Sequence, residues 1–95
     1  MLNREHKLAK VHFRGRVQGV WFRAFTREQA IAAGLTGWVR NLPDGSVEAV
    51  FEGDEDVIRR AIEKCRQGPP SARVDQVDID WQEASSEFSA FDIRR

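Results

Sequence analysis

The chain has 95 residues, of which 41% are hydrophobic and 32% are charged. One core usually organises about 100 to 200 residues, so we expect residues 1–95 to form a single domain, and a two-domain enzyme, a disordered chain and a collagen-like chain are excluded. Fifteen basic and fifteen acidic residues cancel, which disfavours nucleic-acid binding through bulk positive charge.

The sequence indicates neither a membrane segment nor a disulfide framework. No apolar run approaches the roughly 18 residues of a membrane helix, and the start, MLNREHKLAK, is charged. Cys65 is the only cysteine, which excludes an internal disulfide and a zinc-type cysteine pair. We therefore expect a cytoplasmic protein with no membrane partner, in which residues 1–6 form an N-terminal tail.

The first half of the chain predicts a strand, a helix and a hairpin. Residues 7–14 alternate apolar and polar side chains, which is typical of a half-buried strand. Residues 22–34 hold good helix formers and end at Gly34, a residue type favoured just after a helix. Their apolar stripe is moderate and consists of Phe22, Phe25, Ala30 and Ala33. Residues 35–41 and 46–52 are rich in strand formers and flank the turn sequence LPDG, so they predict a hairpin.

The second half predicts a helix followed by two strands. In residues 54–68, Asp54 can cap the first turn, and Lys64 and Arg66 complement the helix dipole in the last turn. Residues 74–81 and 88–93 have the alternation of strands. The element order predicts a ferredoxin-like α/β (α+β) sandwich, with an antiparallel mixed sheet of four to five strands and two helices on one face.

The first candidate site is the junction between the first strand and the first helix. It runs from Gly15 through Arg16, Val17, Gln18, Gly19, Val20, Trp21 and Phe22 to Arg23. Glycines let the main chain curl so that several N–H groups converge on one anion, and the dipole of the following helix adds positive charge. Arg23, in the first helical turn, opposes that dipole but could hold two phosphate oxygens. From these residues alone, an ordinary solvent-facing arginine remains the alternative.

The second candidate is Asn41, at the end of a predicted strand. Its amide can donate and accept at once, which suits it to orient a water molecule. The local sequence by itself favours a simpler role, an asparagine that helps to form the turn. His12 is expected on the surface and Cys65 on the buried face of the second helix, and the motifs GxSxG and HExxH are absent.

Three segments together resemble one protein family. GRVQGVWFR (residues 15–23) and GWVRNLPDGSVEAVFEG (residues 37–53) resemble the paired signatures of the acylphosphatase family, and GPPSARV (residues 68–74) resembles a further segment of it. The similarity covers about residues 8–94, although FDIRR lacks the terminal aromatic residue often found in the family. The resemblance implies a ferredoxin-like fold, a phosphate-binding arginine at Arg23, a catalytic asparagine at Asn41 and a main-chain phosphate cradle from Gly15 to Val20.

The resemblance also implies an activity: hydrolysis of the carboxyl–phosphate bond of acyl phosphates by in-line attack of water. A carboxylate is a weak base, with a conjugate acid of pKa about 4, so its departure needs no proton from the enzyme. We therefore expect that the reaction needs no metal and no cofactor. We also expect a monomer that acts on small-molecule acyl phosphates and does not bind nucleic acid. One alternative is a non-catalytic phosphate- or acyl-phosphate-binding module, such as the related domain of hydrogenase-maturation carbamoyltransferases. Another is an RNA-binding sandwich, for which the aromatic platform is not evident.

Overall fold

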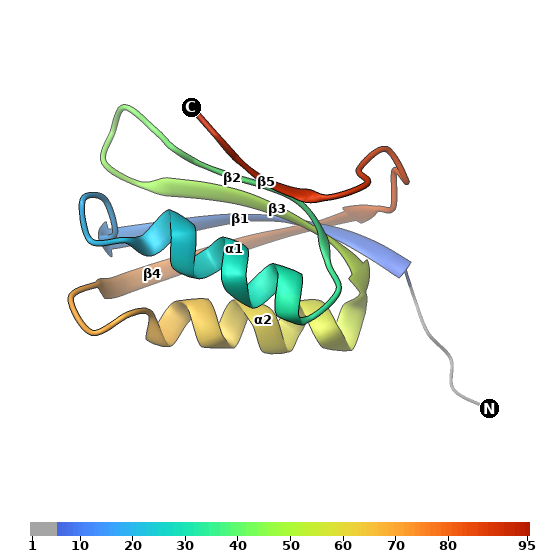
Figure 1. Ribbon diagram of the computed structural model, residues 1–95, viewed down its shortest axis with the longest axis horizontal. Helices are drawn as coiled ribbons and strands as arrows, with labels where there is room; N and C mark the ends of the chain where they lie inside the picture. The colour runs from blue at the N-terminus through green and yellow to red at the C-terminus, as the bar shows by residue number, and fades with distance from the viewer. Residues whose placement is uncertain (1–5) are drawn as a thin grey trace.

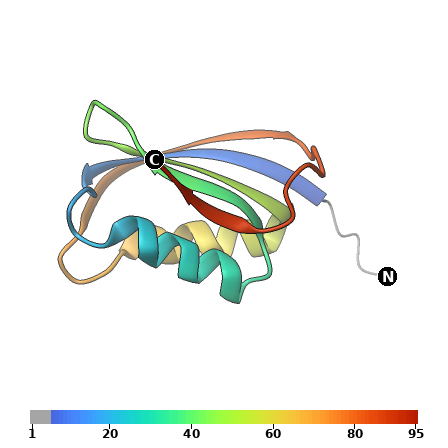
Figure 2. The same ribbon diagram turned by 45° about the horizontal axis from the view of Figure 1, so that its top comes forward.

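The strands form one five-stranded sheet in the order β4-β1-β3-β2-β5. The computed structural model describes residues 6–95. The elements are β1 (His6–Arg16), α1 (Phe22–Ala32), β2 (Thr36–Asn41), β3 (Val47–Asp54), α2 (Glu55–Gln67), β4 (Arg73–Glu83) and β5 (Phe91–Arg94). Both helices cover the same face of the sheet and leave the other face open (Figures 1 and 2).

The topology is that of the predicted ferredoxin-like sandwich. The elements from β1 to β4 follow the expected order, and the three contacts among their strands are antiparallel. β5 adds a fifth strand beside β2, and this pair is parallel, which makes the sheet mixed. β1 begins at His6, which pairs with Asp54, so the strand takes in the last residue of the expected tail; residues 1–5 lie outside the described residues.

The strand register decides which side chains face the helices. Val11 of β1 lies opposite Ala49 of β3, which lies opposite Val39 of β2, and all three side chains are buried in the main core. Side chains alternate along a strand. Two residues beyond Val39, Asn41 therefore also faces the helices, in a row with Val47 and Phe13.

The two helices bury different kinds of surface. In α1 the fully buried residues are Phe22, Thr26 and Ala30, at a spacing of four, whereas Phe25, expected in the apolar stripe, is only half-buried. In α2 the buried residues are Ile58, Ala61, Ile62 and Cys65, and burial raises the pKa of Cys65 to about 12. A thiol with such a pKa stays protonated at neutral pH and is a poor nucleophile.

The open face of the sheet contains two buried carboxylates. Burial on its own would raise the pKa of Glu48. The hydrogen bond that Glu48 accepts from Arg40, together with the charges of Lys10 and Arg40, holds that pKa below its usual value. Glu52, 2% exposed, accepts hydrogen bonds from the main-chain amides of Ser85 and Ser86. Glu52 therefore fixes the connection between β4 and β5, and through it the position of the edge strand.

We predict that Glu52→Ala lowers the free energy of unfolding by about 1–3 kcal/mol, because two main-chain donors lose a charged acceptor. Glu52→Gln should lose less, since its amide oxygen still accepts. Urea unfolding followed by tryptophan fluorescence measures both. Glu63→Ala is the control, because Glu63 is exposed on α2 and its contact with Arg66 is long, at 3.9 Å. Equal losses in the Glu52→Ala and Glu63→Ala variants would contradict this role.

Candidate active site

The start of α1 is anchored in the core by one aromatic side chain. Phe22 is 1% exposed and packs edge-on against Phe13 of β1, with ring centroids 5.1 Å apart. A buried ring at the first position of a helix fixes both the height and the rotation of the first turn. The next residue, Arg23, is consequently held half-buried at the margin of the core.

The first turn of α1 has none of the usual features that satisfy a helix N-terminus. Its N-cap residue, Trp21, makes no side-chain capping bond, and the first turn contains no acidic residue. In contrast, the Asp54 side chain caps α2, and Glu55 and Asp56 follow it. Free amides and an uncompensated dipole make a helix N-terminus attractive to anions. The start of α1 therefore retains its affinity for an anion, whereas that of α2 is satisfied internally.

The segment before α1 curls in a way that favours anion binding. Gly19 and Trp21 have positive φ values, 72° and 67°, whereas Val20 between them does not. Alternation of left-handed and right-handed residues turns successive N–H groups towards one side, a conformation called a nest. The main-chain amides of residues 17–20 donate no hydrogen bond to another part of the described chain. The curl thus presents free donors beside the start of the helix.

A hollow of about 180 Å³ lies between this curl and the end of β2. It is lined by Val17, Gly19, Trp21, Phe22, Arg23, Ala24, Asn41 and Ile93. The Oδ1 atom of Asn41 is buried and has no hydrogen-bond partner within residues 6–95. A buried acceptor without a partner is unusual and costs free energy, so it indicates a place for a water molecule or a ligand.

Arg23 contributes a positive charge that the rest of the described chain does not neutralise. Its guanidinium forms no ion pair and no hydrogen bond with residues 6–95. Two arginines of the sheet are paired, in contrast: Arg14 with Asp44 and Asp78, and Arg40 with Glu48. A half-buried guanidinium with all its donors free, beside free main-chain amides, is suited to a doubly charged oxyanion.

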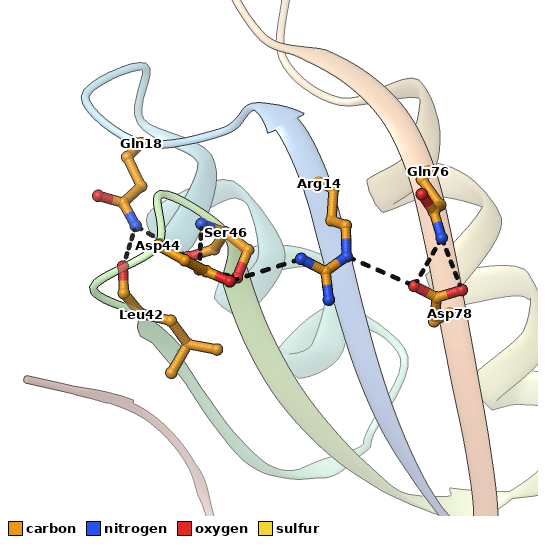
Figure 3. A network of polar contacts seen from close by, with 7 residues as sticks. All are labelled: Arg14, Gln18, Leu42, Asp44, Ser46, Gln76 and Asp78. Atoms are coloured by element: carbon orange, nitrogen blue, oxygen red, sulfur yellow. Dashed lines mark hydrogen bonds and ion pairs between the residues drawn. The ribbon is translucent and has the colours of Figure 1, made fainter.

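The side chain of Gln18 joins the curl to the turn that follows Asn41 (Figure 3). Its Nε2 atom donates to the carbonyl oxygens of Leu42 and Ser46, each at 2.8 Å. The Leu42 amide also donates to the Ser46 carbonyl, at 2.9 Å, which closes the turn. Gln18 thereby links the two chain segments that form opposite sides of the hollow.

A chain of polar contacts continues from this turn across the sheet (Figure 3). The Asp44 carboxylate accepts from the hydroxyl of Ser46 at 2.5 Å and from the Arg14 guanidinium at 3.4 Å, and Arg14 also lies 3.6 Å from Asp78. The hydrogen bonds from Ser46, together with Arg14, hold the pKa of Asp44 below its usual value. The turn is consequently tied to β1 and β4 as well as to the curl.

The structure brings together some of the predicted site residues and separates others. Val17, Gly19, Arg23 and Asn41 all line the hollow. Gly15 and Arg16 instead end β1 and pair with β4, the Gln18 side chain points to the turn, and Val20 packs against the core. The sequence patterns indicate no role for Trp21 or for Ile93. Trp21 lies inside the GRVQGVWFR segment and could have been noticed, whereas Ile93 reaches the hollow only through the pairing of β5 with β2.

The residues that line the hollow limit the chemistry it can support. Among residues 6–95, no carboxylate, imidazole or thiol lines it. Within residues 6–95, no three His, Cys, Asp or Glu side chains are grouped so that they could hold a metal ion. Neither α1 nor α2 has the length and apolar character needed to cross a membrane. The described lining residues offer a ligand one guanidinium, one carboxamide and main-chain N–H groups.

Comparison with known proteins identifies the family. The acylphosphatase family model matches residues 9–93. An acylphosphatase of Pelotomaculum thermopropionicum is 52% identical over 85 residues, which is 90% of this chain and 92% of the relative. The crystal structure of acylphosphatase from Bacillus subtilis superposes with a TM-score of 0.91 at 31% identity, covering 94% of this chain and 99% of that one. An acylphosphatase structure from Coxiella burnetii gives 0.87 at 36% identity, covering 99% and 100%. The chain therefore belongs to the acylphosphatase family, whose members act on small-molecule acyl phosphates.

Proposed function

We propose that the hollow is the catalytic site, in which Arg23 and the free main-chain amides of residues 17–20, within the expected Gly15–Val20 cradle, hold the phosphoryl group while Asn41 orients the attacking water. This proposal rests on one observation: the unpaired guanidinium of Arg23 and the unpartnered carboxamide oxygen of Asn41 line the same hollow. Of the six cradle residues, Val17 and Gly19 contribute to the lining. The Oδ1 atom of Asn41 would accept a hydrogen bond from the water and so fix its direction of approach.

The reaction requires little from the side chains beyond these two roles. Water oxygen attacks phosphorus, the bond from phosphorus to the carboxylate oxygen breaks, and a carboxylate and dihydrogen phosphate result. In phosphoryl transfer, catalysis comes mainly from positioning and from positive charge near the equatorial oxygens, which Arg23 and the amides supply. The water proton passes to an oxygen of the phosphoryl group itself. No metal and no cofactor is needed for this reaction, because the carboxylate leaves without protonation.

A non-catalytic phosphate-binding module explains fewer of these features. The curl and Arg23 would be sufficient to bind an anion, but binding alone gives no role to the Asn41 carboxamide. A catalytic site gives a role to the curl, to Arg23 and to the Asn41 carboxamide. An RNA-binding role is also less well supported, since the open face of the sheet mixes basic side chains with Glu48, Asp78 and Asp80.

We also propose that the protein acts as a monomer in the cytoplasm, without nucleic acid or membrane as a partner. The described residues expose four large apolar side chains, and two of them, Trp21 and Ile93, line the hollow rather than a separate surface. Cys65 is a free, buried thiol, which fits a reducing compartment.

The first prediction separates the two catalytic roles. Arg23→Ala should lose about 100-fold or more in kcat/KM and lose inhibition by inorganic phosphate, because the charge on the phosphoryl oxygens is no longer balanced. Asn41→Ala should lose about 100-fold in kcat but keep phosphate inhibition, since only the water is misplaced. Phosphate release from benzoyl phosphate in EDTA measures both, with Arg66→Ala, an exposed arginine on α2, as control. Near-normal turnover by either variant would refute the assignment.

The second prediction concerns the leaving group. Benzoyl phosphate should be hydrolysed readily in the presence of EDTA, whereas sugar phosphates and other monoesters should react slowly, because an alkoxide needs an acid or a metal to leave. Parallel phosphate-release assays at one enzyme concentration make the comparison. Rapid monoester hydrolysis with chelator present would reveal a group that this mechanism lacks.

The third prediction tests Gln18 as a positioning residue. Gln18→Ala removes both hydrogen bonds to the turn but leaves the main-chain amide of residue 18 in place. We expect kcat to fall about tenfold while the inhibition constant for phosphate changes little, because Asn41 is displaced and the cradle is not. Gln18→Glu, which brings a charge against two carbonyl oxygens, should be worse. A loss of stability without the kcat effect would assign Gln18 a structural role only.

A further inference from the structure

The hollow has a polar side and an apolar rim. Arg23 and Asn41 form the polar side, and the rim consists mainly of Trp21 and Ile93, which are 57% and 39% exposed. Only two other large apolar side chains are comparably exposed within residues 6–95, Ile31 and Ile79, and neither lines this hollow. Exposed apolar side chains that gather at a concave site indicate a ligand surface, whereas scattered ones do not.

The two rim residues come from different parts of the fold. Ile93 of β5 lies opposite Val39 of β2, two residues before Asn41, so its side chain faces the same side of the sheet. Trp21 immediately precedes α1, and its ring meets that of Phe25 edge-on at a centroid distance of 6.4 Å. The indole is therefore supported from the helix side while most of its surface remains open.

Trp21 departs from two local preferences, one of backbone conformation and one of residue type at a helix N-cap. A left-handed φ of 67° is rare for a residue with a large side chain, and an N-cap position favours Ser, Thr, Asp or Asn. Glycine or asparagine would satisfy the backbone geometry better. Departures of this kind cluster at functional sites, where the side chain supplies something the backbone preference does not.

We propose that Trp21 and Ile93 form the binding surface for the acyl group, and that the chain selects acyl phosphates whose acyl group is aromatic or otherwise large and apolar. This inference rests on the proposed function. The phosphoryl group is common to every acyl phosphate, so the cradle cannot distinguish one substrate from another. The acyl group extends from the phosphorus towards the mouth of the hollow, where the indole face can pack against a flat ring.

The test compares benzoyl phosphate with acetyl phosphate, which share the phosphoryl group and differ in the acyl group. For the wild type we expect a lower KM for benzoyl phosphate. Trp21→Gly removes the indole, keeps the left-handed φ accessible and adds no capping group. In this variant the KM for benzoyl phosphate should rise about tenfold, while the KM for acetyl phosphate and the inhibition constant for inorganic phosphate change less than about twofold. Trp21→Phe should keep most of the preference for benzoyl phosphate. Ile93→Ala should reduce the ratio of the KM for acetyl phosphate to the KM for benzoyl phosphate about threefold.

Ile31→Ala is the matched control, because Ile31 is 52% exposed on α1 but lies outside the hollow. It should leave both KM values unchanged. The proposal is overturned if the KM ratio is the same in Trp21→Gly and wild type, if Ile31→Ala changes that ratio, or if Trp21→Gly weakens benzoyl phosphate, acetyl phosphate and phosphate equally. Hydrolysis of neither substrate by the wild type would overturn the proposed function itself, whereas hydrolysis of both with an unaltered ratio in the variants removes only the role of the rim.

Discussion

The register between β2 and β3 is the constraint on which the site depends. Because side chains alternate along a strand, a slip of one residue would send the Asn41 carboxamide to the open face of the sheet. Two contacts oppose such a slip. At one end of β2, a Cβ atom on Gly37 would lie 1.8 Å from the Val50 carbonyl oxygen, so only glycine fits there. At the other end, Gln18 binds both sides of the turn.

The two helices show how the same structural element can serve stability or binding. The start of α2 has a capping aspartate and two further acids, and a cap of this kind contributes about 1 kcal/mol. The start of α1 has neither a capping side chain nor an acid, and a cation in its first turn opposes the dipole. A bound phosphoryl group would satisfy the dipole, the free amides and Arg23 together. The features that destabilise α1 in isolation are thus those that a dianion would stabilise.

The sequence was sufficient to predict most of the fold, because its signals are local. Alternation located the strands, the Asp54 cap located α2, and the LPDG turn located the hairpin. The stripe of α1 was assigned less well, since the buried Thr26 is polar and carries no hydrophobic signal. The position of β5 beside β2 depends on long-range pairing. Because Ile93 reaches the hollow only through this pairing, no local pattern could predict its position there.

For the site, sequence and structure contribute different parts of the argument. Residue types alone left Arg23 and Asn41 with ordinary alternatives, a solvent-facing arginine and a turn-forming asparagine. The resemblance to the acylphosphatase family favours a phosphate-binding role for Arg23 and a catalytic role for Asn41. The geometry supports this proposal, since both side chains lack partners within the described chain and line one hollow. The side-chain role of Gln18 was not foreseen, because nothing in GRVQGV indicates that its amide reaches a turn 24 residues away.

The unsatisfied groups at the hollow require a fold that is stable without them. An orphan carboxamide oxygen, a left-handed tryptophan and an unpaired guanidinium each raise the free energy of the ligand-free protein. They persist because the surrounding contacts fix the backbone independently, through the Phe13–Phe22 pair, the paired strands and the polar chain from Gln18 to Asp78. Internal partners for Arg23 and Asn41 would stabilise the fold, but they would also occupy the donors and the acceptor that the proposed mechanism uses. In the proposed mechanism, the site must therefore remain locally unsatisfied so that it can bind phosphate and orient water.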